Sequence, residues 1–99
     1  MVKTAINIVW TLQAKESLKE IYDYYKKKSL QGAKNVKNDI LKSPKTIHYS
    51  KQYQVDDINA KYRRIVVRDF KVLYREIGTQ ITIMDIICTL QSPKILKET

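Results

Sequence analysis

The stretch that decides the fold is YRRIVVRDFKVLYREI, residues 62–77, followed after Gly78-Thr79 by QITIMDIICTL over 80–90. Its residues alternate between two faces, with Phe70, Val72 and Tyr74 on one and Lys71, Leu73 and Arg75 on the other. Arg68-Asp69 and residues 77–79 are its only plausible turns. We therefore expect three strands, over 62–68, 70–77 and 80–90, joined as an antiparallel meander.

The chain before this stretch begins with a predicted strand and helix. Residues 4–10 alternate, which predicts a strand with Ile6, Ile8 and Trp10 on its buried side. Thr11 is a good helix N-cap, because its hydroxyl can accept a hydrogen bond from an unpaired N–H group of the first turn. An apolar stripe at helical spacing follows, in a helix that should end near 28–29: Ala14, Leu18, Ile21, Tyr22 and Tyr25.

A second helix is expected after a brief interruption at Gln31-Gly32. Its markers are Ala33, Val36, Ile40 and Leu41, and Ser43-Pro44 ends it because the residue before a proline is disfavoured in the α region. A connection of three or four residues predicts an antiparallel helical hairpin.

These elements predict one α+β domain over residues 1–99, with a loose tail at 90–99. An N-terminal strand would be followed by a helical hairpin that packs on one face of a mostly antiparallel, curved sheet. A structureless 18-residue loop over 44–61 would be uncommon, so we expect a short extended piece around Tyr53–Asp56.

Composition narrows the function classes. Nineteen Lys and Arg against ten acids give a net charge of +9, which favours an anionic partner. One Cys excludes an intrachain disulfide framework and a Cys-based zinc cluster. No apolar run approaches the length of a membrane span, and we see no signal peptide, so we expect a cytoplasmic protein without metal or cofactor.

The arginines are clustered, since all four lie within 13 positions. With Lys71 they would place positive charge on the open face of the sheet, as a binding surface: Arg63, Arg64, Arg68 and Arg75. The alternative is ordinary solubilising charge. The clustering favours binding, because a guanidinium is the better fork for phosphate or carboxylate.

Three residues of the 44–61 segment could take part in chemistry on RNA. His48 is the only side chain with an unperturbed pKa near neutrality, although a surface loop histidine is the more ordinary interpretation. Tyr49 and Tyr53, near Lys45 and Lys51, could stack on bases, or could pack the loop onto the core.

Three further features favour structural roles. Asp56-Asp57 lacks the neighbouring ligands of a metal site and is expected to form a turn or cap before Asn59. Cys88 is expected as a small buried hydrophobe. Asp85, among isoleucines, is expected to pair with an Arg or Lys of a neighbouring strand.

The ordered set of these motifs resembles the RelE/ParE family of toxins from type II (plasmid stabilisation) toxin–antitoxin systems. The resemblance covers residues 4–90 and is carried by WTLQA at 10–14, the stripe to Tyr25, the second helix, the 62–75 stretch and ITIMDII at 81–87. It implies growth inhibition, and a hetero-oligomer with an antitoxin encoded beside the toxin, whose acidic or amphipathic segment wraps it.

The family divides by target. RelE-like members cut mRNA in the ribosomal A site, whereas ParE-like members inhibit DNA gyrase and are not nucleases. Arg63 and Lys71 match positions that are basic in the RelE-like nucleases, but residues 88–93 lack the Arg, His or Tyr that those nucleases usually carry after the last strand. The resemblance therefore favours a ParE-like toxin. The alternatives are a ribosome-dependent endonuclease and a non-catalytic nucleic-acid-binding module.

Overall fold

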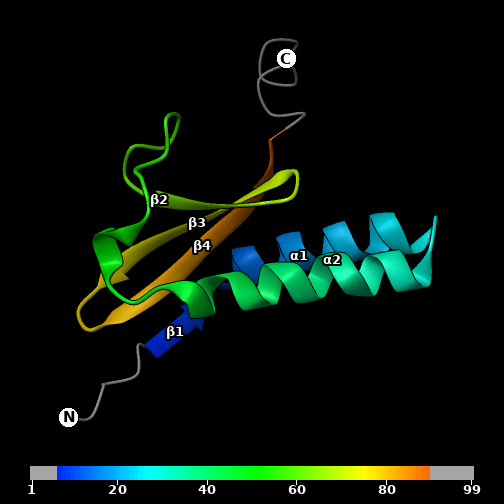
Figure 1. Cartoon of the computed structure of the whole chain (residues 1–99), viewed down its shortest axis with the longest axis horizontal. Coiled ribbons are helices and arrows are strands. Elements are labelled where there is room, and N and C mark those ends of the chain that lie inside the picture. Colours follow the sequence, from blue (N-terminus) through cyan, green and yellow to red (C-terminus); the bar gives the residue numbers. More distant parts are fainter. Residues whose placement is uncertain (1–6, 90–99) are drawn as a thin grey trace.

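The computed structural model describes residues 7–89, so Ile6 and the tail over 90–99 lie outside the described residues. The elements in chain order are β1 (Asn7–Trp10), α1 (Leu12–Lys26), α2 (Leu30–Lys42), the 3₁₀ helices η1 (Ser43–Thr46) and η2 (Ser50–Gln52), β2 (Arg63–Val67), β3 (Phe70–Ile77) and β4 (Gln80–Cys88). In Figure 1 the two helices run side by side as a hairpin against the sheet. The predicted α+β class is confirmed.

The sheet has the strand order β1-β4-β3-β2. β2, β3 and β4 form the predicted antiparallel meander, while β1 lies parallel to β4, with Trp10 opposite Ile83. The register between β3 and β4 shifts at Leu73/Tyr74, because Leu73 faces Asp85 and Tyr74 faces Ile83. This irregularity gives β4 one extra residue and bends it.

Both predicted turns are present. Gly78 adopts φ 63° between β3 and β4, where a residue without a Cβ is unstrained. Arg68 adopts φ 55° between β2 and β3, a left-handed conformation that is uncommon for a side chain of this kind. The backbone carbonyl of the next residue, Asp69, accepts hydrogen bonds from the N–H (2.7 Å) and hydroxyl (3.0 Å) of Thr89, which fixes this turn to the end of β4.

Each helix begins at a hydroxyl cap. The Thr11 hydroxyl accepts from the Ala14 N–H at 3.1 Å, as expected. The Ser29 hydroxyl accepts from the Gly32 N–H at 3.0 Å, and this cap starts α2 at Leu30. The predicted interruption at residues 31–32 is therefore wrong, because both residues lie inside α2. The three-residue connection, 27–29, instead comes earlier in the chain, and α1 ends at Lys26.

The core lies between the helical hairpin and one face of the sheet. Its helical side includes Ala14, Leu18, Val36 and Ile40, and its sheet side includes Ile65, Phe70, Val72, Tyr74, Ile81, Ile83 and Ile86. Ile21 and Tyr25 pack at its margin, as does Cys88, which is half-buried rather than fully enclosed. Tyr22 lies outside this cluster, and its ring is flanked by the ammonium groups of Lys26 and Lys37.

The 44–61 segment is more ordered than its sequence suggests. The two 3₁₀ helices were not predicted, but the extended piece near Tyr53–Asp56 is confirmed by a bridge between Val55 and Arg63. The Asp56 N–H donates to the Tyr62 carbonyl (2.9 Å), and the Arg64 N–H donates to the Gln54 carbonyl (3.0 Å). This segment therefore covers the first half of the outer edge of β2. Neither helix within residues 7–89 has the length and apolar character needed to cross a membrane.

Candidate functional site

The structure divides the five clustered basic residues among three places. Arg68 pairs with Asp39 of α2, with 2.7 Å between Nε and Oδ2, so it faces the helical hairpin. Arg64 and Lys71 lie on the opposite, helix-free face. Arg63 and Arg75 lie where β2 begins and β3 ends. The single basic surface expected from the sequence is therefore distributed over three environments, and within residues 7–89 only that of Arg63 and Arg75 contains no ion pair.

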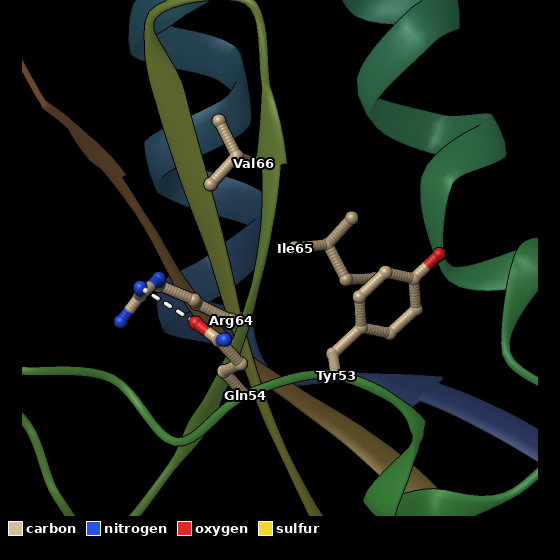
Figure 2. Close-up of a pocket in the computed structure, with 5 residues that line it drawn as sticks. All are labelled: Tyr53, Gln54, Arg64, Ile65 and Val66. Atoms are coloured by element: carbon tan, nitrogen blue, oxygen red, sulfur yellow. Dashed lines mark hydrogen bonds between the residues drawn. The ribbon is translucent and has the colours of Figure 1, made fainter.

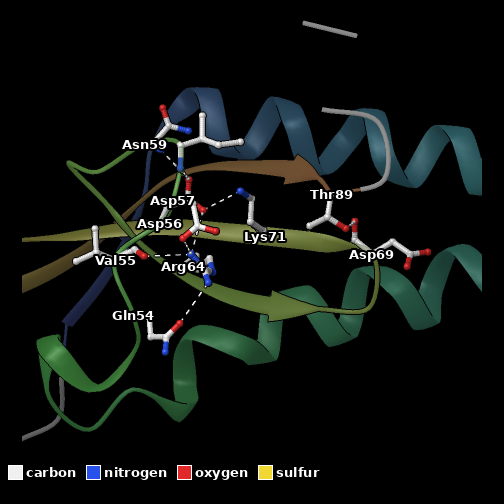
Figure 3. Close-up of polar contacts among 10 residues, drawn as sticks. Gln54, Val55, Asp56, Asp57, Asn59, Arg64, Asp69, Lys71 and Thr89 are labelled. Atoms are coloured by element: carbon white, nitrogen blue, oxygen red, sulfur yellow. Dashed lines mark hydrogen bonds and ion pairs between the residues drawn. The ribbon is translucent and has the colours of Figure 1, made fainter. Parts of the chain in front are cut away.

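The helix-free face carries a buried ion cluster around Asp56, shown in Figure 3. Lys71 alternates with the core residues Phe70 and Val72, so its side chain points away from the helices. It meets Asp56, with 2.7 Å between Nζ and Oδ1. The side chains of Asp56 and Lys71 are 0% and 12% exposed, respectively. The segment that carries Asp56 thus covers the predicted open face at this point.

Asp56 also makes the turn that the sequence predicts. Its Oδ2 accepts from the N–H groups of Ile58 (3.1 Å) and Asn59 (2.8 Å). Burial would raise the pKa of this carboxyl, but the hydrogen bonds from Lys71, Asn59 and Ile58 outweigh that effect and hold the pKa below the usual 3.8. Asp56 is therefore ionised at neutral pH and fastens the loop to the sheet.

Arg64 ties the same loop to β2. Its guanidinium donates to the Val55 carbonyl (3.1 Å), the Asp57 carboxylate (3.2 Å) and the Gln54 amide oxygen (3.2 Å). Figure 2 shows the Gln54 contact beside a shallow pocket of about 350 Å³ lined by Tyr53, Gln54, Arg64, Ile65 and Val66. With its guanidinium engaged by three neighbours, Arg64 acts as a structural tie.

A second pocket, of about 230 Å³, lies where β2 begins and β3 ends. Its lining combines Arg63 and Arg75 with two lysines, of which only Lys51 is expected in a basic setting from the sequence, and is completed by an acid and two hydroxyl residues: Ser50, Lys51, Lys61, Arg63, Tyr74, Arg75 and Glu76. We call it the basic pocket. Lys51 and Lys61 come from the segment preceding β2, and no spacing signal in the sequence brings them to Arg75.

Two hydrogen bonds fix the walls of the basic pocket. Tyr74, fully buried on β3, donates its hydroxyl to the Ser50 carbonyl at 2.8 Å and so holds η2 against the sheet. Arg63 lies opposite Tyr74 in the strand register and donates to the Tyr53 carbonyl at 2.8 Å. Burial raises the pKa of the Tyr74 hydroxyl above the usual 10.0, so this group stays protonated at neutral pH and serves the structure.

The remaining RNA-related candidates lie apart from the basic pocket lining. His48 is exposed between η1 and η2, and its backbone N–H donates to the Gln52 side chain at 2.7 Å. Tyr53 packs edge-on against Tyr74, with ring centroids 6.4 Å apart, and its hydroxyl contacts Thr46. Tyr49 is exposed. Of the two tyrosines that could stack on bases, Tyr53 instead packs against the core.

In the part of the chain that the structure describes, the acidic residues of the sheet form no metal-binding group. Among the described residues, no group of three or more His, Cys, Asp or Glu is placed to hold a metal ion. The expected pairing of Asp85 with a neighbouring cation is wrong: its Oδ1 accepts from the Ser17 hydroxyl of α1 at 2.5 Å and from the Ile86 N–H. The bend in β4 next to Met84 accompanies this turn of Asp85 toward α1.

Comparison with known proteins identifies the family. A family model of the ParE toxin of type II toxin-antitoxin system, parDE, matches residues 8–93. A solved structure of the chromosomal ParDE TA system from P. aeruginosa has the same fold, with a TM-score of 0.73 and 21% identity over 85% of this chain and 96% of that chain. A YoeB/ParE toxin from Agrobacterium tumefaciens gives a TM-score of 0.45 and 15% identity, over 84% and 98% of the two chains. No curated protein matches in sequence. Since the family model spans nearly the whole chain, the protein belongs to the ParE toxin family of type II toxin–antitoxin systems.

Proposed function

We propose that the protein is a non-enzymatic toxin that binds and inhibits DNA gyrase in the cytoplasm and is neutralised by a cognate antitoxin. Its membership of the ParE family supports this proposal. The burial and the ion pairing of the groups that RNA cleavage would need also support it. Such cleavage requires a base for the 2′-hydroxyl, an acid for the leaving oxygen and exposed positive charge at the phosphate.

The observation that carries the proposal is the buried pair of Lys71 and Asp56. A lysine that stabilises a phosphorane-like state must present its ammonium group to the RNA. Here that group is held 2.7 Å from a fully buried carboxylate, and the lysine side chain is only 12% exposed. Lys71 therefore supports the fold. Tyr74 and His48 do not complete an acid–base pair, because the first is buried and protonated and the second lies outside the basic pocket lining.

Induced expression in a bacterial host separates the two targets. Gyrase inhibition should stop growth with cellular transcripts intact and plasmid DNA less negatively supercoiled. The readouts are mapping of mRNA 5′ ends and gel analysis of plasmid topoisomers, with co-expression of the antitoxin as the control that restores both growth and topology. Cut transcripts with unchanged topoisomers would overturn the proposal.

A second candidate function is ribosome-dependent mRNA cleavage, and the basic pocket is the observation that favours it. Arg63, Arg75 and the two lysines could stabilise charge on a phosphate, and Glu76 is the one carboxylate in the lining. Glu76→Gln tests this candidate directly. If the toxin is a nuclease that uses Glu76 as base, the variant should lose transcript cleavage about 100-fold or more. A variant that arrests growth like the wild type removes this role for Glu76.

A further inference from the structure

Lysines from both helices gather on one side of the helical hairpin. On α1, residues 15, 19, 22 and 26 follow one another at intervals of four, three and four, so three lysines and Tyr22 share one stripe of the helix. The Nζ atoms of Lys26 and of Lys37, from α2, lie 5.7 and 5.2 Å from the centroid of the Tyr22 ring. Lys34 precedes Lys37 by less than one helical turn and shares its side of α2. All five lysines are exposed, and we call them the lysine stripe: Lys15, Lys19, Lys26, Lys34 and Lys37.

The lysine stripe has little negative charge beside it. Asp23 pairs with Lys19, with 3.0 Å between Oδ2 and Nζ, on the surface of α1. Within residues 7–89, none of the other four lysines has a carboxylate within 4.0 Å. Asp39, the one acid of α2, is engaged by Arg68 instead. In the part of the chain that the structure describes, most of the charge of the lysine stripe is therefore left without a counter-charge.

The stability of the helices does not account for this charge. A cation in the last turn of a helix is favourable, and Lys26 occupies such a position in α1. The same argument does not extend to Lys34, which lies in the N-terminal half of α2, behind a first turn that contains no acid. Lys15 and Lys19 are four residues apart on one helix face, a spacing at which like charges repel each other. Charge held at such a cost favours a partner of opposite sign.

The geometry of the lysine stripe suits a long partner with regularly spaced charges. From Lys15 to Lys26 the stripe runs about 16 Å along the axis of α1. Figure 1 shows the closed end of the hairpin projecting beyond the strands, so the sheet leaves this part of the helices accessible. Duplex DNA carries about one negative charge per 1.7 Å of its axis, so a segment of the same length presents about ten phosphate charges. A duplex lying along the hairpin would therefore bring several phosphates to several ammonium groups.

The side chains of the lysine stripe favour a duplex over a single strand or an acidic peptide. Proteins that bind single strands stack bases on aromatic faces. The Tyr22 ring is only half-exposed and has the ammonium groups of Lys26 and Lys37 over it. Carboxylates are bound best by the arginine fork, and all four arginines lie elsewhere, within 63–75. Lysine ammonium groups are point charges that suit phosphate, so the stripe fits a backbone whose bases are already paired and stacked.

We propose that the lysine stripe binds the phosphate backbone of duplex DNA, whatever its base sequence, with Lys26 and Lys37 at the centre of the contact. This binding goes beyond the proposed function and does not depend on it, because it needs only the protein and DNA. It would concentrate the protein on DNA, the substrate of gyrase, before any contact with the enzyme. The clustered arginines of β2 and β3 take no part in it.

Two double variants separate the lysine stripe from general charge attraction. Lys26→Gln/Lys37→Gln removes the two charges beside Tyr22, and glutamine has a helix propensity close to that of lysine. The matched control, Lys42→Gln/Lys45→Gln, removes two exposed cations at the opposite end of α2 and in η1, so the net charge falls equally. Lys26→Arg/Lys37→Arg retains the charge. Circular dichroism checks that each variant folds. Fluorescence anisotropy with a duplex of about 20 base pairs then measures the dissociation constant from about 50 to 200 mM salt.

The salt dependence and the affinities should both identify the lysine stripe. For the wild type, the logarithm of the binding constant should fall with the logarithm of the salt concentration with a slope of about −3 to −4, as about four neutralised phosphates imply. The Lys26→Gln/Lys37→Gln variant should bind about 10-fold or more weakly at the lowest salt, with a slope shallower by about 2. The control should lose less than about 3-fold, and the arginine variant should bind as the wild type does.

Several results would overturn the site. They are a wild type that shows no salt-dependent binding of the duplex, an unchanged affinity in the glutamine variant, an equal loss in the control, and a loss in the arginine variant. Two competitors test the identity of the partner, a single-stranded oligonucleotide of the same length and polyglutamate. Both should displace the labelled duplex less well than unlabelled duplex does. Stronger competition by either one means that the stripe takes an unpaired strand or an acidic protein, and the proposal is then wrong.

Because this binding is measured without gyrase, the two proposals fail separately. A toxin that leaves DNA topology unchanged contradicts gyrase inhibition, whatever its affinity for the duplex. A duplex that binds without the lysine stripe contradicts the site, whatever the toxin does to gyrase.

Discussion

The two groups of cations on either side of β2 use the same residue types in opposite ways. Around Asp56, Arg64 and Lys71 contact two carboxylates and two other acceptors, and they hold a loop onto the sheet. In the basic pocket, Arg63 and Arg75 stand with Lys51 and Lys61 and only Glu76. Balanced charge of this kind stabilises a fold, whereas unbalanced charge destabilises it slightly and attracts a partner. The position of the acidic residues, rather than the number of cations, distinguishes a cluster that supports the fold from one that is available to a partner.

The largest effect is expected from Asp56→Asn. The change leaves the ammonium group of Lys71 buried without its counter-charge, which costs about 3 kcal/mol of the free energy of unfolding. Urea denaturation measures it. Asp57→Asn is the matched control, because that side chain is 84% exposed and its loss should cost less than about 1 kcal/mol. Similar costs for the two variants would break the distinction between the buried cluster and the surface.

The contribution of Asp56 to the free energy of unfolding should also depend on pH. The pKa of Asp56 is lower in the folded chain than its usual 3.8, so the unfolded chain binds the proton more readily. The stabilisation is therefore complete above that usual value and is lost as the pH falls through the folded pKa. Urea denaturation of the wild type and Asp56→Asn over this range should show the gap between them narrowing. A gap that stays constant down to about pH 2 would contradict an ionised Asp56 as its cause.

Arg68 provides an intermediate case, a paired but half-exposed cation. Arg68→Ala removes the ion pair with Asp39 while the left-handed backbone strain remains, so we expect a cost of about 0.5 to 1 kcal/mol. Asp39→Ala and the double variant complete a cycle that isolates the pair. A coupling energy above about 2 kcal/mol would place Arg68 with the buried cluster instead.

The smallest effect is expected in the basic pocket. Arg75→Gln removes a cation that has no ion pair within the described residues, so stability should change by less than about 0.5 kcal/mol, with a slight gain from reduced repulsion. Thermal unfolding at low salt is the measurement. A loss above about 1 kcal/mol would mean that Arg75 supports the fold, and the contrast between the two regions would disappear.

The sequence predicts the framework well because local chemistry determines it. Arg68-Asp69 and Gly78 place both turns, the alternation over 70–77 assigns the faces of β3, and Thr11 caps α1 as expected. The apolar pattern alone places the start of α2 after Gly32, whereas the Ser29 hydroxyl caps the helix, starts it at Leu30 and encloses Gly32.

The site is less predictable because it depends on contacts between distant segments. The cluster of arginines is visible in the sequence, but its division depends on where the acids fall. The sequence indicates that Asp56 is a turn residue, and only the fold shows that it reaches Lys71. Lys51 and Lys61 join the basic pocket because Tyr74 holds η2 against β3, a contact that no spacing reveals.

The most direct test of the proposed function is supercoiling of relaxed plasmid DNA by purified gyrase, titrated with the purified full-length protein. We expect the toxin to abolish supercoiling and prior mixing with an equimolar amount of antitoxin to restore it. Undiminished supercoiling at a large excess of folded toxin would contradict gyrase inhibition by this protein.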